Sequence, residues 1–121
     1  MNKYKNGSKE ILEDLLSPCI EAFALVSREG LMIQSINTNE VTDEKISILS
    51  AAMLSMSLRT CEIFGEGSLN DIILKTSDGY IIIKKVNKDV LLTVFATSIC
   101  ELEKLLIELR TASNSLMELY N

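Results

Sequence analysis

The feature that most constrains this chain is a long apolar segment at residues 42–64, which is typical of a single helix. Thr42 or Asp43 is a suitable N-terminal cap, and an acidic first turn suits the positive end of the helix dipole. After that first turn, the only charged side chains in the segment are Arg59 and Glu62. A helix with so few charges needs cover on more than one side, so it limits which folds are possible.

The apolar side chains of this helix fall on two different sides. One side, which we expect to pack on a sheet, carries Ile46, Leu49, Ala52, Met53, Met56, Ile63 and Phe64. The other side carries Ala51, Leu54, Leu58 and Cys61. Because one sheet covers only one side of a helix, we expect the second side to form an interface between subunits. The alternative is that a terminal helix of the same chain covers it.

The rest of the chain is typical of an α+β domain with an antiparallel sheet. The predicted order is helix 8–16, strands 19–27 and 31–36, helix 42–64, strands 69–76, 80–86 and 90–97, and a last helix. Ser8 is the predicted cap of the first helix, and Ser98 with Glu101 forms a predicted capping box for the last. We expect a flexible tail at residues 1–7 and one domain at residues 8–121.

The strand at residues 69–76 is expected at an edge of the sheet, because strands 19–27 and 90–97 are apolar throughout and therefore central. A bare edge invites pairing, and pairing with its own copy would extend the sheet across a two-fold axis. Helix and edge then contribute to one dimer interface. Its predicted residues are Ala51, Leu54, Leu58, Cys61, Leu69, Asn70, Asp71, Ile72, Ile73 and Leu74.

The composition excludes several classes of function. The 121 residues include no histidine, which removes the common zinc sites and the histidine-based catalytic triads and dyads. A net charge of −5 argues against binding to nucleic acid. Cys19, Cys61 and Cys100 have no C-x-x-C spacing, and we expect them to be reduced thiols that pack as small apolar residues. We predict no catalytic residue, metal or cofactor, and no enzyme.

The sequence shows neither a targeting segment nor a membrane span. Residues 1–9 are polar and contain three lysines, unlike a signal peptide. We find no uninterrupted apolar stretch of about 18 residues, the length that crosses a bilayer. We therefore expect a cytoplasmic protein that does not insert directly into membranes.

Several short motifs, in their order and spacing, resemble the roadblock domains, the family of the dynein light-chain roadblock proteins. The motifs are SREGLMI at 27–33, SAAM at 50–53, FGEGSL at 64–69, DGYII at 78–82 and VLLTVFA at 90–96. The similarity extends from residue 8 to residue 120. One departure is Ile99-Cys100-Glu101, which stands where many members carry a glycine.

The resemblance implies a five-stranded antiparallel sheet in the order 2-1-5-4-3, the roadblock/profilin-like arrangement. It places the long helix on one face and the terminal helices on the other. It also implies dimerisation through the third strand and the long helix, with the chain itself or with a related roadblock chain. Family members regulate or scaffold small Ras-like GTPases, as in gliding-motility switches and the Ragulator complex, or act as adaptors on dynein.

The function predicted from these features is that of a non-catalytic homodimeric regulator or scaffold. It binds a small Ras-like GTPase through the helix layer of the dimer, and the candidate contacts are Ser55, Arg59 and Glu62. The chain itself has no G-x-x-x-x-G-K-[ST] phosphate loop. The alternative is a small-molecule sensor or adaptor domain of profilin-like or PAS-like type, which needs a pocket between sheet and helix with convergent polar groups.

Overall fold

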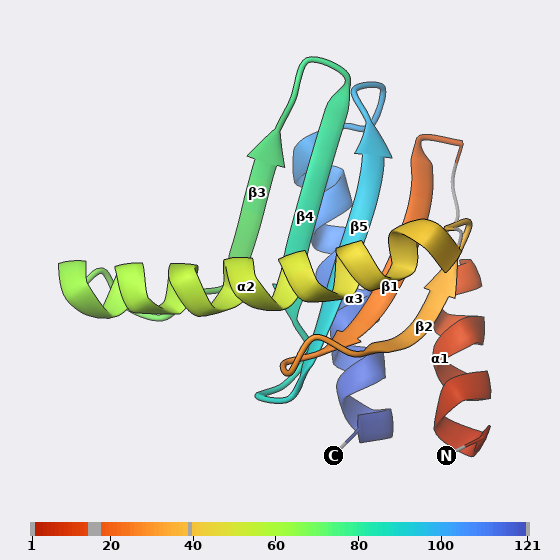
Figure 1. Cartoon of the computed structure of the whole chain (residues 1–121). Helices are drawn as coiled ribbons and strands as arrows, with labels where there is room; N and C mark the ends of the chain where they lie inside the picture. The colour runs from red at the N-terminus through yellow and green to blue at the C-terminus, as the bar shows by residue number, and fades with distance from the viewer. Residues whose placement is uncertain (1, 15–17, 39, 121) are drawn as a thin grey trace.

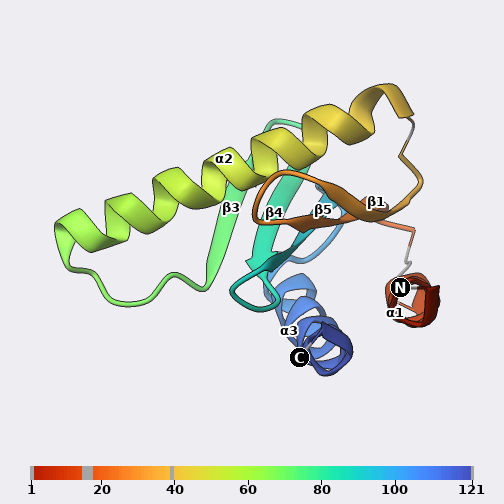
Figure 2. The same cartoon turned by 60° about the horizontal axis from the view of Figure 1, so that its bottom comes forward.

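The computed structural model describes residues 2–14, 18–38 and 40–120, and its elements follow the predicted order. They are α1 (Asn2–Asp14), β1 (Ile20–Ser27), β2 (Met32–Ile36), α2 (Glu40–Phe64), β3 (Asp71–Lys75), β4 (Gly79–Lys85), β5 (Val90–Thr97) and α3 (Leu102–Tyr120). Figure 1 shows α2 crossing one face of the sheet. Figure 2 shows α1 and α3 on the opposite face, so the fold has three layers.

The five strands form one antiparallel sheet in the order β2-β1-β5-β4-β3, which confirms the predicted α+β class and strand order. β1 and β5 are neighbours in the middle of the sheet, as their apolar sequences predicted. Alternate residues of β1 enter opposite layers. Phe23 and Leu25 join the core beneath α1 and α3, whereas Ala24 and Val26 join the core beneath α2. This two-sided burial explains why the strand is apolar at nearly every position.

The larger of the two cores lies between the sheet and the terminal helices. Leu12 of α1 and Leu105, Leu109 and Leu116 of α3 are almost completely buried there. The three leucines of α3 recur at the helical period and so lie on one side of the helix. The smaller core lies between the sheet and α2, where Leu54 is 2% exposed.

The first helix begins at Asn2, six residues before the predicted start at Ser8, and so takes in most of the expected tail at residues 1–7. Ser8 is buried within the helix and is not a cap. Gly7 packs so closely on α3 that a Cβ added to it would lie 3.1 Å from Cδ1 of Leu119. Contact with α3 thus supports the extra turns. The division into a tail at 1–7 and a domain at 8–121 otherwise stays a prediction.

The starts of the other two helices also differ from the prediction. α2 begins at Glu40, and the Asp43 carboxylate accepts hydrogen bonds from the hydroxyls of Ser35 and Thr38, which precede the helix. α3 begins at Leu102, so the predicted capping box is wrong. The carbonyl of Glu101 accepts the N–H of Leu105 at 3.0 Å, as the residue just before a helix does. Residues 98–100 form a turn instead of helix.

Candidate interaction surface

The C-terminal end of α2 projects beyond the sheet on the β3 side (Figures 1 and 2). Every residue from Glu62 to Ser68 is exposed, which agrees with this position. The helix ends at Phe64, as predicted, and Gly65 follows with a φ of 64°, the left-handed conformation that a helix terminus favours. The last turns of α2 therefore have no cover within the described part of the chain.

The structure changes the predicted roles of the two sides of α2. Ile46 and Met53 pack toward the sheet, as predicted, but the other residues of the predicted sheet side are exposed: Leu49, Ala52, Met56, Ile63 and Phe64. Ala51 and Leu54, which were predicted to meet a second subunit, are buried at 8% and 2% exposure. Leu58 is half-buried against the same core, and Cys61 is half-buried one turn further on. The assignment of Ala51 and Leu54 to an outward interface is therefore wrong, because these side chains already pack on the sheet of their own subunit.

Buried serines explain why this side of α2 faces the sheet. Ser47 and Ser50 are 2% and 3% exposed. The Ser50 hydroxyl lies 2.8 Å from the hydroxyl of Thr93 in β5, and the Ser47 hydroxyl donates to the carbonyl of Glu44 at 2.9 Å. Small side chains let the helix approach the sheet closely, and their hydroxyls find partners when buried. A prediction that considers only bulky apolar residues overlooks this side of the helix, because it ignores the buried serines.

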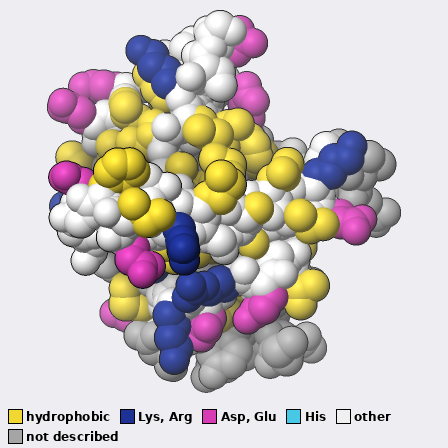
Figure 3. Space-filling model, turned by 60° about the vertical axis from the view of Figure 1, so that its left-hand side comes forward, with side chains coloured by type: hydrophobic (Ala, Val, Ile, Leu, Met, Phe, Trp, Pro, Cys, Tyr) yellow, Lys and Arg dark blue, Asp and Glu magenta, His cyan; other side chains and the backbone are white. Residues whose placement is uncertain are grey.

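The opposite side of α2 is apolar and exposed. We call it the exposed apolar face, and it consists of Ile48, Leu49, Ala52, Met56, Ile63 and Phe64. Met56 and Phe64 are the most open, at 72% and 70% exposure. Figure 3, a view from the β3 side, shows hydrophobic side chains gathered on this part of the molecule. Exposed apolar surface of this kind is a candidate interaction site.

The edge position predicted for the third strand is confirmed. β3 pairs with β4 on one side and with no other strand among the described residues. Ile73 and Leu74 are 39% and 37% exposed. Leu69 and Ile72 pack toward the core beneath α2. The strand thus presents an open edge with apolar side chains beside the exposed apolar face.

Polar groups at the start of β3 are not equally available to a partner. Asn70 is exposed, but the Asp71 carboxylate accepts a hydrogen bond from Lys84 of β4 at 2.9 Å. The side chains of this ion pair are only 23% and 14% exposed. The contact of residues 69–74 with a second chain stays a prediction.

The predicted partner contacts lie on one line along α2. Ser55, Arg59 and Glu62 are separated by four and three residues, and all three are exposed. Ile48 lies on the same line, since it precedes Ser55 by two helical turns. Within residues 2–14, 18–38 and 40–120, Arg59 and Glu62 make no ion pair. The line borders the exposed apolar face.

Two of the three cysteines form a disulfide, so the prediction of reduced thiols is wrong for Cys19 and Cys100. Their Cα atoms are 5.3 Å apart although 81 positions separate them in sequence. Antiparallel pairing of β1 with β5, which places Ile20 opposite Ala96, brings the two cysteines together. No local spacing signals such a pair. Cys61 is a free thiol, as predicted.

The described segments contain no group of three His, Cys, Asp or Glu side chains placed to hold a metal ion. By length and composition alone, Thr42–Phe64 of α2 contains an 18-residue window apolar enough to cross a membrane, with a mean hydropathy of 1.3. This differs from the expectation that no segment of the chain qualifies. One such helix is by itself a weak indication, and 22% of the window is buried within the structure.

Comparison with known proteins agrees with this architecture. Residues 8–96 match the model of the Roadblock/LC7 domain. The gliding protein mglB from Thermus thermophilus superposes with a TM-score of 0.86 at 15% identity, covering 96% of this chain and 90% of that one. Myxococcus xanthus MglB gives 0.84 at 16% identity, with 99% and 96% covered. A structure described as MglB with tetrameric arrangement gives 0.86 at 14%, with 96% and 89% covered. No curated protein matches in sequence.

Proposed function

The chain belongs to the Roadblock/LC7 family, and from this premise we propose that it is a non-catalytic homodimeric regulator or scaffold of a small Ras-like GTPase. The observation that carries the proposal is the exposed apolar face of α2 beside the open edge of β3. Surface of this composition is unfavourable in water and favours a protein partner. We also propose that the protein lies in the cytoplasm, where such GTPases act.

A second copy of the chain, or a related roadblock chain, fits the β3 side of the molecule. Pairing of two β3 edges satisfies the open backbone groups and continues the sheet. Because α2 projects past β3, its C-terminal turns then extend over the neighbouring subunit, and Ile63 and Phe64 gain cover. One similar solved structure, MglB with a tetrameric arrangement, supports self-association as the expectation.

We propose that the GTPase docks on the line of exposed side chains along α2 that Ser55, Arg59 and Glu62 form, with Ile48 beside them. The mechanism is positional. A surface that binds one switch conformation of the GTPase more tightly than the other shifts its population and therefore its nucleotide state. Arg59 supplies a charge for an acidic group of the partner and needs no catalytic role.

The test is affinity capture from the native lysate with the immobilised chain, followed by GTP-hydrolysis assays on any small GTPase recovered. We expect the wild-type chain to retain a GTPase and the Arg59→Glu variant to retain roughly tenfold less, the effect of truncating or reversing one contact residue. Arg110→Glu is the matched control, because Arg110 is exposed on α3, in the layer opposite α2. Failure of the wild-type chain to retain any GTPase contradicts the proposal.

A further inference from the structure

The Cys19–Cys100 disulfide joins two chain junctions that lie on the same side of the molecule. Cys19 immediately precedes β1, and Cys100 lies in the turn that leads from β5 into α3. The two cysteines differ in exposure, since Cys19 is partly exposed whereas Cys100 is 6% exposed. An attacking thiol therefore reaches the sulfur of Cys19 more easily than that of Cys100.

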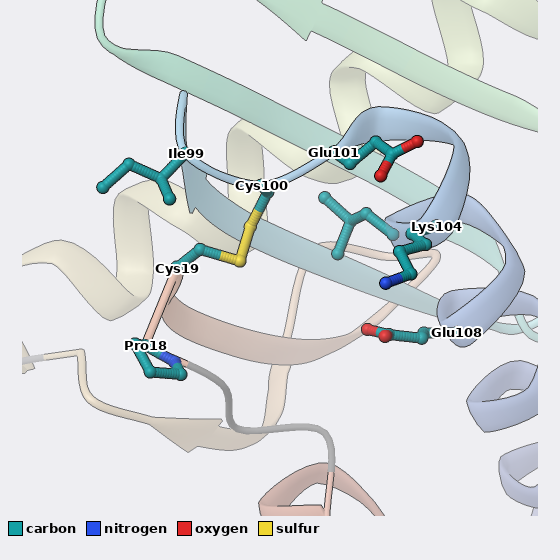
Figure 4. Close-up of a pocket in the computed structure, with 8 residues that line it drawn as sticks. Pro18, Cys19, Ile99, Cys100, Glu101, Lys104 and Glu108 are labelled. Atoms are coloured by element: carbon teal, nitrogen blue, oxygen red, sulfur yellow. A yellow bond between two sulfur atoms is a disulfide. The ribbon is translucent and has the colours of Figure 1, made fainter.

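A surface cavity of about 420 Å³ leads to this bond, and both cysteines line it. Lys104 and Glu108 of α3 line the same cavity, and Figure 4 shows both side chains reaching from the helix toward the disulfide. Ile99, 85% exposed, stands at its rim. The cavity is large enough for a small thiol or the tip of a reductant loop, so the bond is open to reagents from solution.

We propose that this disulfide is a site of thiol exchange. An external dithiol reductant reduces it, and attacks first at Cys19. In the first step the reductant's thiolate forms a bond to Sγ of Cys19. The Cys19–Cys100 bond breaks, and its electron pair leaves with Sγ of Cys100 as a thiolate. In the second step the other thiol of the reductant attacks the mixed disulfide and releases Cys19. The reductant leaves oxidised to a disulfide, and the two cysteine thiolates take protons from water.

The position of Cys100 favours its role as the leaving group. It stands two residues before Leu102, the first residue of α3, where the unpaired N–H groups and the helix dipole stabilise negative charge. Lys104, one turn into the helix, adds a positive charge to the same cavity. Glu101 and Glu108 line the same cavity, so Lys104 offsets only part of their negative charge. A stabilised leaving thiolate speeds thiol exchange.

Opening of the bond affects one layer of the molecule. The N–H of Thr97 still donates to the carbonyl of Cys19 at 2.7 Å, and the N–H of Ser98 to that of Asp78 at 3.0 Å, so the sheet keeps its pairing. The turn that leads into α3 loses its covalent attachment to β1. The α1/α3 layer therefore loosens, while the exposed apolar face of α2 on the opposite side is unchanged. In a reducing compartment a disulfide of this kind acts as a transient or sensing bond.

The test treats the full chain with reduced glutathione under native conditions and quenches it with an alkylating agent in denaturant. Peptide mass mapping is expected to find the glutathione adduct on Cys19 and the alkyl group on Cys100. Cys61, the free thiol, is alkylated in every sample and serves as the internal reference. An adduct first found on Cys100 overturns the assignment of the attacked sulfur.

Kinetics with dithiothreitol test the rest of the proposal. The reduction rate is expected to rise linearly with reductant concentration. Lys104→Gln is expected to slow it roughly two- to fivefold, the range for the loss of one exposed charge–charge interaction with the leaving thiolate. Lys45→Gln, an exposed lysine on α2, is the matched control and leaves the rate unchanged. A rate that saturates at low reductant means that the bond opens only on unfolding, and this result, or equal rates for Lys104→Gln and wild type, overturns the proposal.

Discussion

The hydroxyl groups of Ser50 in α2 and Thr93 in β5 lie 2.8 Å apart and are almost completely buried. This contact joins the helix layer to the centre of the sheet and fixes which side of α2 points inward. Once the serine side faces the sheet, the side with Met56 and Phe64 faces solvent. A single polar pair thus identifies the surface on which the proposed function depends.

Loss of either hydroxyl is expected to destabilise the protein. Ser50→Ala leaves the Thr93 hydroxyl buried without its partner, which costs about 1–3 kcal/mol of unfolding free energy. Thr93→Val has a similar effect, because it leaves the Ser50 hydroxyl unpaired. The double variant is expected to lose less than the sum of the two, because no unpaired hydroxyl remains. Urea unfolding of the four proteins measures the coupling, and strict additivity contradicts it.

Charges placed on the exposed apolar face are expected to separate the dimer. The double variant Met56→Asp and Ile63→Asp keeps the core intact, since both side chains are well exposed, at 72% and 65%. Light scattering is expected to give the monomer mass for this variant and twice that mass for the wild type. Ile107→Asp is the control, because Ile107 is 61% exposed on α3. A double variant with the wild-type mass contradicts the interface.

Removal of the disulfide is expected to lower the unfolding free energy. Cys19→Ser with Cys100→Ser opens a loop of 81 residues, and losses of about 2–4 kcal/mol are typical for such a cross-link. Cys61→Ser, which removes the free thiol, is expected to change stability much less. The comparison is made by urea unfolding without reductant. Equal midpoints for the double variant and the wild type show that the bond adds nothing to stability.

The ion pair at the start of β3 is expected to matter more than the ion pair on α1. Asp71→Asn removes the charge that holds Lys84 at 2.9 Å, where the two side chains are 23% and 14% exposed. We expect a loss of about 1.5–3 kcal/mol, the range for a hydrogen bond between charged groups. The Lys9–Glu13 pair is 3.8 Å long with side chains about half exposed, and Glu13→Gln is expected to cost less than about 0.5 kcal/mol. Thermal or urea unfolding distinguishes the two, and equal losses contradict the ranking.

The sequence by itself determined the class of fold, the element order and the place of most strands. β1 and β5 are apolar at nearly every position because both of their faces are buried, and this pattern can be recognised in the sequence alone. In α3 the buried residues likewise recur at the helical period, Leu105, Leu109 and Leu116 among them. Such signals are local, since each arises from the period of one element against one neighbouring layer.

Helix starts were less predictable, because they depend on contacts with distant parts of the chain. Ser8 has the chemistry of a cap, yet packing of Gly7 on Leu119 favours a longer α1. Ser98 and Glu101 have the spacing of a capping box, yet the turn at Cys100 delays α3 to Leu102. Local propensity is a weak signal that tertiary packing overrides.

Only the tertiary structure decided which side of α2 is the surface and which cysteines are joined. Both sides of the helix carry apolar residues, so their periodicity does not distinguish inside from outside. The Ser50–Thr93 contact does, and it forms only when β5 lies beneath the helix. Likewise, residues 19 and 100 become neighbours only through the pairing of β1 with β5. The long apolar helix was visible in the sequence, but the side that it offers to a partner is set by contacts between residues far apart along the chain.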